Sequence, residues 1–136
     1  MRTKLETVSL GILAAVFFGV ALLGLFAPRI LFEPTGVALE TRAGLAEIRA
    51  AYCGLFGASA FVFFAGARQR IEREFALNVA VLILGGFLGG RVLSWAIDGT
   101  PIAPIAIINL VAEGLGFVVV VSLWWHRRKD RRADPL

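Results

Sequence analysis

Four long apolar stretches constrain this chain more than any other feature. They cover residues 8–27, 43–67, 75–97 and 101–125, and each is long enough to cross a bilayer as an α-helix, which takes about 20 residues. Hydrophobic residues make up 58% of the sequence and charged residues only 18%, which excludes an ordinary soluble domain. The sequence therefore predicts an all-α, polytopic membrane protein with a single domain, 1–136, and its short connections favour an up-down four-helix bundle.

The first stretch has a second interpretation, a cleaved signal peptide, because two cations precede it. Its apolar run is long, however, and the segment before Pro28 lacks a small-x-small cleavage pattern, so we expect a retained helix that ends at this proline. The segment from there to Arg42 is expected to be an interfacial loop. Its apolar residues Ile30, Leu31 and Phe32 are expected to dip into the membrane interface.

Positive charge is distributed unevenly about the four stretches. With four crossings, one side holds ten cations and the other holds only Arg29 and Arg42, so the charge reflects membrane topology and not nucleic-acid binding. This asymmetry also opposes a dual-topology transporter. Residues 126–136 form a basic tail on the cation-rich side. The ten cations are Arg2, Lys4, Arg68, Arg70, Arg73, Arg127, Arg128, Lys129, Arg131 and Arg132.

Ionisable residues within the apolar stretches need partners, since a charge at a helix centre costs about 2.5 to 3.5 kcal/mol on insertion scales. Arg91 and Glu113 are expected to meet, because Cα–Cβ bonds tilt toward the N-terminus of a helix and these two helices run in opposite directions. Helical spacing places Ser94, Trp95 and Asp98 on the Arg91 face. The candidate polar pocket, in the membrane half away from the termini, comprises Arg49, Tyr52, Arg91, Ser94, Asp98, Asn109 and Glu113.

Two interpretations of these polar residues stay open. Either they join the helices structurally, with each charge paired to an opposite charge, or they line a pocket for an anionic or amphiphilic headgroup. Small residues raise a similar choice, because two overlapping GxxxG pairs favour close packing inside the bundle or, less strongly, an oligomer interface. These pairs comprise Gly85, Gly86, Gly89 and Gly90. Thr100 and Pro101 are expected to begin the fourth helix as its N-cap and first residue.

Cysteine and histidine are too scarce to carry redox or metal chemistry. Cys53 is the single cysteine and His126 the single histidine, so one chain can form neither an internal disulfide nor a bis-histidine site. We therefore predict no cofactor and no metal.

Several short motifs resemble those of the bacterial domain-of-unknown-function 4345 family. They are Glu47-Ile-Arg49-Ala-Ala-Tyr52-Cys-Gly54, Gly90-Arg91-Val-Leu-Ser94 and Asp98-Gly99-Thr-Pro101 followed by Glu113. Members are similar in having four predicted transmembrane helices, and here Cys53 replaces the first glycine of a paired-glycine element. The resemblance covers nearly the whole chain and implies a multi-pass protein of the bacterial inner membrane, which the charge asymmetry would orient with both termini in the cytoplasm. It implies no substrate, cofactor or reaction.

Three functions are compatible with the sequence. The first is a non-enzymatic membrane protein, either an accessory subunit in a larger membrane complex or a small bundle that binds a lipid or quinone. The alternative is a membrane enzyme acting on a lipophilic substrate, with Glu113 or Asp98 as acid or base and Arg91 stabilising an anion. A proton-coupled transporter is disfavoured because the first stretch has no acidic residue.

Overall fold

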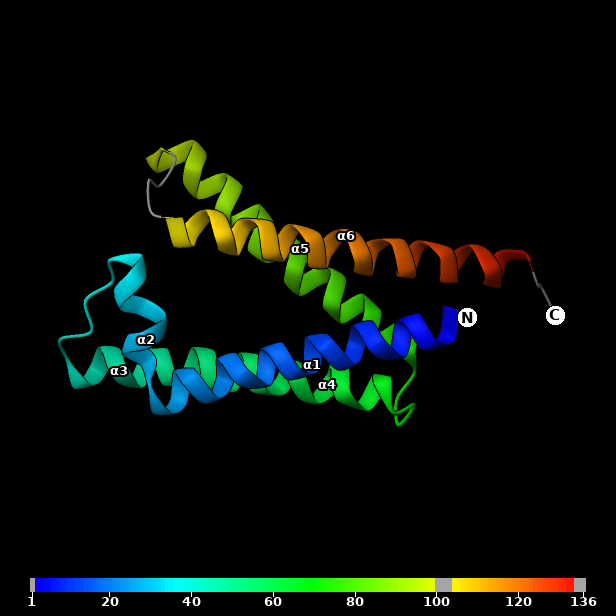
Figure 1. Cartoon of the computed structure of the whole chain (residues 1–136), viewed down its shortest axis with the longest axis horizontal. Coiled ribbons are helices and arrows are strands. Elements are labelled where there is room, and N and C mark those ends of the chain that lie inside the picture. Colours follow the sequence, from blue (N-terminus) through cyan, green and yellow to red (C-terminus); the bar gives the residue numbers. More distant parts are fainter. Residues whose placement is uncertain (1, 100–103, 134–136) are drawn as a thin grey trace.

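The computed structural model describes residues 2–99 and 104–133, which are helical apart from short connections (Figure 1). The first span is α1 (Arg2–Phe26), and α2 (Pro28–Phe32) and the 3₁₀ turn η1 (Glu33–Thr35) follow it. The second span is one continuous rod of three parts. These are α3 (Arg42–Ile48), the π-helix η2 (Arg49–Phe56) and α4 (Gly57–Ala67), after which come α5 (Arg73–Asp98) and α6 (Pro104–Ala133).

The predicted fold class is confirmed. Four helical spans are long and apolar enough to cross a membrane, and they alternate in direction along the chain (Figure 1). The last span does not end where the apolar stretch ends, because α6 continues from Trp125 through the basic segment to Ala133. The expected roles of Thr100 and Pro101 fall outside the described residues.

Local hydrogen bonds begin and end the second span. The Thr41 side chain is the N-cap of α3 and accepts a hydrogen bond from the backbone N–H of Gly44 at 3.0 Å. At the other end, the N–H of Arg70 donates to the carbonyl of Ala65 at 2.9 Å while Gln69 has a φ of 58°. This is the left-handed termination in which glycine is usual, so the chain turns sharply from α4 toward α5.

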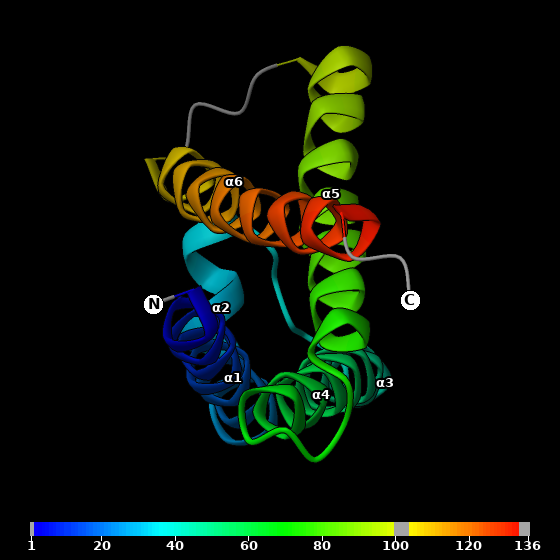
Figure 2. The same cartoon turned by 90° about the vertical axis from the view of Figure 1, so that its right-hand side faces the viewer.

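The four spans are not evenly packed. The first two lie side by side and antiparallel, whereas α5 crosses them obliquely and packs against α6, which lies above α1 in Figure 2. Only 6% of the most apolar stretch of α6 is buried, against 22–33% for the other three spans. The first turn of α1 and the last turns of α6 lie at the same end of the molecule, which we call the terminal end (Figure 1).

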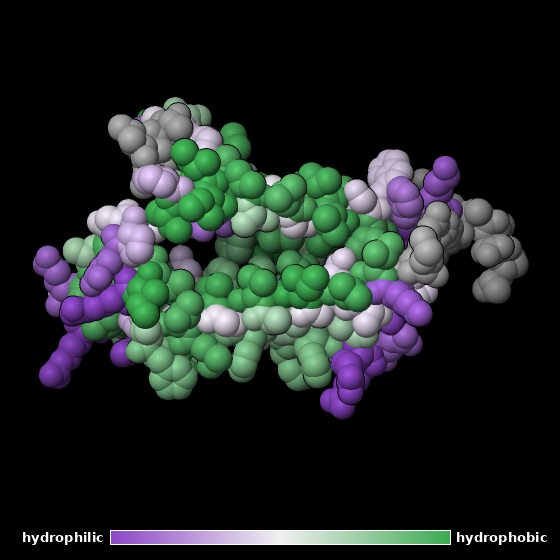
Figure 3. All heavy atoms as spheres, viewed as in Figure 1, coloured by the Kyte–Doolittle hydropathy of each residue, from purple (hydrophilic) through white to green (hydrophobic). Residues whose placement is uncertain are grey.

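The hydrophobic core occupies the half of the molecule nearer the terminal end. Leu10, Phe63 and Leu77 are fully buried there and pack with small side chains of α1, α4 and α5. Every buried residue of α5 falls between Arg73 and Leu84, in the first half of that helix. Beyond it, α5 and α6 diverge from the first two spans, and the surface is hollowed between α1 and α6 (Figure 3). We call this region the open half.

The loop after α1 differs from the sequence expectation at one residue. Ile30 is 65% exposed, as a residue dipping into the membrane interface would be, but Phe32 is only 7% exposed. Pro28 begins the short helix α2, which turns the Phe32 ring edge-on to Tyr52 at a centroid distance of 4.7 Å. The expectation for Phe32 was therefore wrong, because a helical turn after the proline points its ring back into the protein.

Glycines allow two helices to approach closely, but mostly at positions outside the GxxxG pairs where the sequence predicted it. A Cβ on Gly24 would stand 2.8 Å from the Cβ of Tyr52, and one on Gly66 would collide with Ala76. Of the four glycines in the GxxxG pairs, Gly85 alone lies against a neighbour, the Phe117 ring of α6. Apart from chain neighbours and the nearby backbone of α5 itself, no described atom lies within 4 Å of a Cβ built on Gly86, Gly89 or Gly90. Internal packing therefore accounts for Gly85 and not for the other three.

Candidate functional site

An ion pair between α5 and α6 is the centre of the candidate site. The Nε of Arg91 donates to Oε2 of Glu113 at 2.6 Å, and its Nη2 donates to Oε1 at 2.8 Å. The two side chains are 31% and 19% exposed, so the pair is partly buried in the open half. The contact predicted from the sequence is confirmed. The contact is bidentate, since both carboxylate oxygens accept hydrogen bonds. The two opposite charges cancel, so the pair is neutral as a unit.

The π-helix brings Tyr52 to this pair. In η2 the backbone hydrogen bonds span five residues rather than four, so the side chains turn more slowly around the axis than in an α-helix. Tyr52 lies within electrostatic reach of both Arg91 and Glu113, and its hydroxyl donates no hydrogen bond to another described residue. A half-buried hydroxyl beside a partly buried ion pair is therefore available to a ligand.

Aromatic rings continue from Tyr52 into the core. The Tyr52 ring stacks on Phe56 at 5.2 Å, and Phe56 in turn stacks on Phe87 of α5 at 5.5 Å. With the Phe32 ring against its other side, the Tyr52 ring is held in place. We call Phe32, Tyr52, Phe56 and Phe87 the aromatic column. It gives the polar group at Tyr52 an apolar wall drawn from three segments of the chain.

The other four candidate pocket residues do not contact this pair. The Nε of Arg49 donates to the backbone carbonyl of Leu25 at 3.1 Å, so Arg49 satisfies a terminal carbonyl of α1. Ser94 and Asp98 are exposed and make a 3.5 Å hydrogen bond with each other on the last turns of α5. Asn109 is half-buried and makes no side-chain hydrogen bond to a described residue. The structure thus gathers Tyr52, Arg91 and Glu113, and the wider seven-residue pocket stays a prediction.

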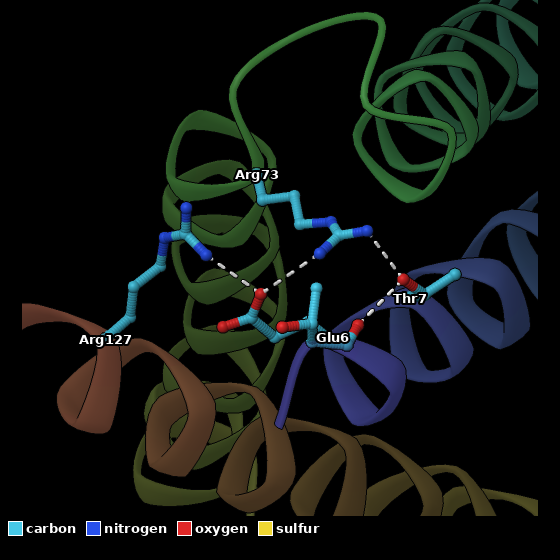
Figure 4. A network of polar contacts seen from close by, with 5 residues as sticks. Glu6, Thr7, Arg73 and Arg127 are labelled. Carbon is cyan, nitrogen blue, oxygen red and sulfur yellow. Dashed lines mark hydrogen bonds and ion pairs between the residues drawn. The ribbon is translucent and has the colours of Figure 1, made fainter. Parts of the chain in front are cut away.

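A second polar cluster, which the sequence analysis missed, joins three helices at the terminal end (Figure 4). Glu6 of α1 accepts a hydrogen bond from Nη1 of Arg127 of α6 at 2.9 Å and pairs with Nη1 of Arg73 of α5 at 3.8 Å. The Nη2 of Arg73 donates to Thr7 at 2.8 Å. Glu6 and Arg73 are each 7% exposed. The sequence held one signal, because Glu6 continues the helical spacing of the buried residues Leu10, Ala14, Phe17 and Ala21.

One further side-chain hydrogen bond connects α5 and α6. The indole Nε1 of Trp124 donates to Oδ1 of Asn78 at 2.5 Å. Together with the Arg91 to Glu113 pair, this contact fixes α6 on α5 at two levels, although α6 touches little else. The Trp124 indole also carries the guanidinium of Arg128 over its ring at 4.4 Å.

These features define an all-α, multi-pass membrane protein with one ion pair inside the bundle and a second polar cluster at its terminal end. The family model described as domain of unknown function DUF4345 matches residues 5–126, so the chain belongs to that family and the resemblance is confirmed. No curated protein and no solved structure matches the chain.

Proposed function

We propose that this protein is a non-enzymatic, inner-membrane amphiphile binder of bacterial type, with its site in the open half. The polar group of the ligand binds at Tyr52, Arg91 and Glu113, and the apolar part lies against the aromatic column. The observation that carries this proposal is the free hydroxyl of Tyr52, held by ring stacking within electrostatic reach of an ion pair inside the bundle.

The charge balance narrows the class of ligand. Glu113 already compensates Arg91, so an anionic headgroup would meet no excess positive charge at this pair. Arg91 still has N–H donors that the carboxylate does not use, and Tyr52 can donate or accept. A neutral headgroup with carbonyl oxygens suits these groups, and a flat ring suits the aromatic wall. We therefore propose a quinone or another neutral-headed lipid in preference to the anionic headgroup considered from the sequence.

The same geometry weighs against the enzymatic alternative. A general base must lie within hydrogen-bond reach of the proton that it removes, and the Glu113 carboxylate is instead oriented toward Arg91 by two hydrogen bonds. Asp98, the other acid considered, lies exposed near the end of α5 and bonds to Ser94. Glu113 is thus already paired with the cation that would stabilise an anion, and Asp98 makes no described hydrogen bond or ion pair with that cation.

Binding of a short-chain quinone tests the proposal. Decylubiquinone is titrated into the detergent-solubilised full chain, and quenching of tryptophan fluorescence is followed, since Trp95 lies one helical turn from Arg91. Tyr52→Phe removes only the hydroxyl and should weaken binding about fivefold, the effect of one hydrogen bond worth about 1 kcal/mol. Ser122→Ala is the matched control, because among the described residues its hydroxyl bonds only to the carbonyl of Val118 on the same helix.

Two results would reject this function. If Tyr52→Phe binds decylubiquinone as tightly as the unaltered protein, or if neither binds it, the site is not a quinone site. Native mass spectrometry from mild detergent then distinguishes the remaining possibilities. A co-purifying lipid of another class would redirect the proposal to that lipid, and a stable complex with a second protein would favour the accessory-subunit function.

We also propose that both termini lie in the cytoplasm, which the ten-to-two cation asymmetry supports. An alkaline phosphatase fusion is active only outside the cytoplasm. Fusions after Leu136 and within residues 68–72 should be inactive, and a fusion within residues 36–41 should be active. The opposite pattern would reverse the orientation.

A further inference from the structure

The terminal end of the bundle contains a hollow whose lining is dominated by arginine. It has a volume of about 540 Å³ and lies between the turn after α4, the start of α5 and the basic part of α6. Arg70, Arg73 and Arg127 line it together with a single acid, Glu72, which makes an interaction of its own. Gln69 and Ile71 complete the wall. Glu6 also pairs with Arg73 and Arg127, so the three guanidinium groups and the carboxylates of Glu72 and Glu6 leave one net positive charge at the hollow.

Arg73 makes this hollow more than a solvated patch of surface charge. Its side chain is only 8% exposed, and its Nε has no hydrogen-bond partner among the described residues. The carboxylate of Glu6 is shared, because it also accepts the shorter, 2.9 Å hydrogen bond from Arg127. The Nε of Arg73 is shielded from solvent, so a ligand in the hollow would be met by the other nitrogens of these arginines.

The start of α5 adds backbone donors to the same hollow. Glu72 is the N-cap of this helix, but its side chain makes no capping hydrogen bond, so the first backbone N–H groups of α5 are not capped by it. Glu72 and Arg73 themselves line the hollow, which places the positive end of the helix dipole beside the arginines. The hollow therefore lies beside both the N-terminus of α5 and a buried cation.

A second hollow, of about 390 Å³, shares two of these residues. Gln69 and Arg73 line it from one side, and Lys4 of α1 adds a further cation. Arg73 thus stands between two hollows, each with at least one further cation in its wall. A phosphate group has the charge, the size and the several acceptor oxygens to satisfy such a set of donors.

We propose that the arginine-lined hollow at the terminal end binds a phosphate group, held by Arg70, Arg73 and Arg127 at the N-terminus of α5. Basic pockets between helices at the membrane surface suit the headgroup phosphate of an anionic phospholipid, although soluble phosphate offers the same chemistry. This site is separate from the neutral-headgroup site of the open half, and neither proposal depends on the other.

Thermal unfolding of the full chain in detergent tests this site, because a ligand that binds only the folded state raises the midpoint. The probes are short-chain phosphatidylglycerol, phosphatidylcholine of the same chain length, and inorganic phosphate, with sodium chloride at equal ionic strength as the reference. We expect stabilisation by phosphatidylglycerol above that by phosphatidylcholine. Inorganic phosphate acting as strongly as phosphatidylglycerol would identify soluble phosphate as the source.

Matched arginine variants test whether the ligand binds at this site or is held only by a general attraction between opposite charges. Arg70→Gln should weaken the apparent affinity about fivefold, the contribution expected of one arginine near an anionic surface. Arg68→Gln is the control, because Arg68 lies over the Phe64 ring and lines a different, apolar groove. Glu72→Gln removes the opposing charge and should strengthen binding.

The proposal is overturned if Arg68→Gln and Arg70→Gln weaken binding equally, or if sodium chloride stabilises the protein as much as phosphatidylglycerol does. Arg70 is exposed and contacts neither Glu6 nor Thr7, so its replacement should leave the fold intact. A fold defect in Arg70→Gln without ligand would appear directly as a lower midpoint.

Discussion

Replacing the two members of the Arg91 to Glu113 pair, singly and together, should show that each charge is tolerated only because of the other. We expect Arg91→Leu and Glu113→Leu each to destabilise the protein, because each leaves an unpaired charge between α5 and α6. The double variant should be more stable than the worse single variant, since it leaves no unpaired charge.

The magnitude follows from the geometry of the pair. Breaking a fully buried pair costs about 3 to 5 kcal/mol, and a lone charge at a helix centre costs about 2.5 to 3.5 kcal/mol. Arg91 is 31% exposed and Glu113 is 19% exposed, so the lower part of this range applies. We expect about 2 to 3 kcal/mol for each single variant and about 1 kcal/mol for the double variant. The coupling free energy, which is the sum of the single effects less the double effect, is then about 3 to 5 kcal/mol.

Equilibrium unfolding in mixed micelles, with an anionic detergent as denaturant, measures these free energies. Arg68→Leu is the control, because it removes an exposed arginine that stacks on Phe64 and has no carboxylate partner among the described ion pairs. It should change the free energy of unfolding by less than about 0.5 kcal/mol. A coupling free energy below about 0.5 kcal/mol would refute the argument that the two charges compensate each other.

Three further substitutions test contacts in the half that contains the core, each by thermal unfolding in detergent. Glu6→Gln should cost about 3 kcal/mol, because two guanidiniums lose their shared carboxylate, and a loss below about 1 kcal/mol would show that other groups already compensate them. Gly66→Ala should cost about 1 to 3 kcal/mol, because the added Cβ collides with Ala76. Gly54→Ala is its control, since the added Cβ meets open space and should be neutral or stabilising. Equal effects of the two variants would contradict the close approach at Gly66. Gln69→Gly should stabilise the protein by about 1 kcal/mol, because Gln69 has a φ of 58°, and a destabilised variant would mean that its side chain outweighs this strain.

The candidate site was predictable in part. Helical spacing and the tilt of Cα–Cβ bonds were enough to bring Arg91 to Glu113, because both lie on straight helices that follow the 3.6-residue period. The same spacing did not reveal that Arg49 donates to the carbonyl of Leu25. An α-helical period does not hold across η2, and nothing in the local sequence marks a π-helix, because tertiary contacts stabilise it.

The polar cluster at the terminal end shows a different limit of prediction from sequence. Glu6 and Arg127 are 121 positions apart and lie at the two ends of the described chain. Charges at the ends of apolar stretches are normally solvated, so a sequence alone gives little reason to pair them. Their contact depends on α5 crossing the first two spans, which brings α6 back toward the start of α1 (Figure 1).

The sequence by itself determined the number of spans, their approximate ends and their alternating directions. The reason is physical: a bilayer leaves each backbone polar group no partner except within its own helix, so apolar length alone selects the spanning segments. It did not determine the tilt and rotation of those helices, which short connections leave free and side-chain packing decides. Only the tertiary structure therefore decided that Phe32 is buried and that Gly86, Gly89 and Gly90 face outward. It also decided that Tyr52 lies within electrostatic reach of the ion pair and that Arg49 bonds to the end of α1.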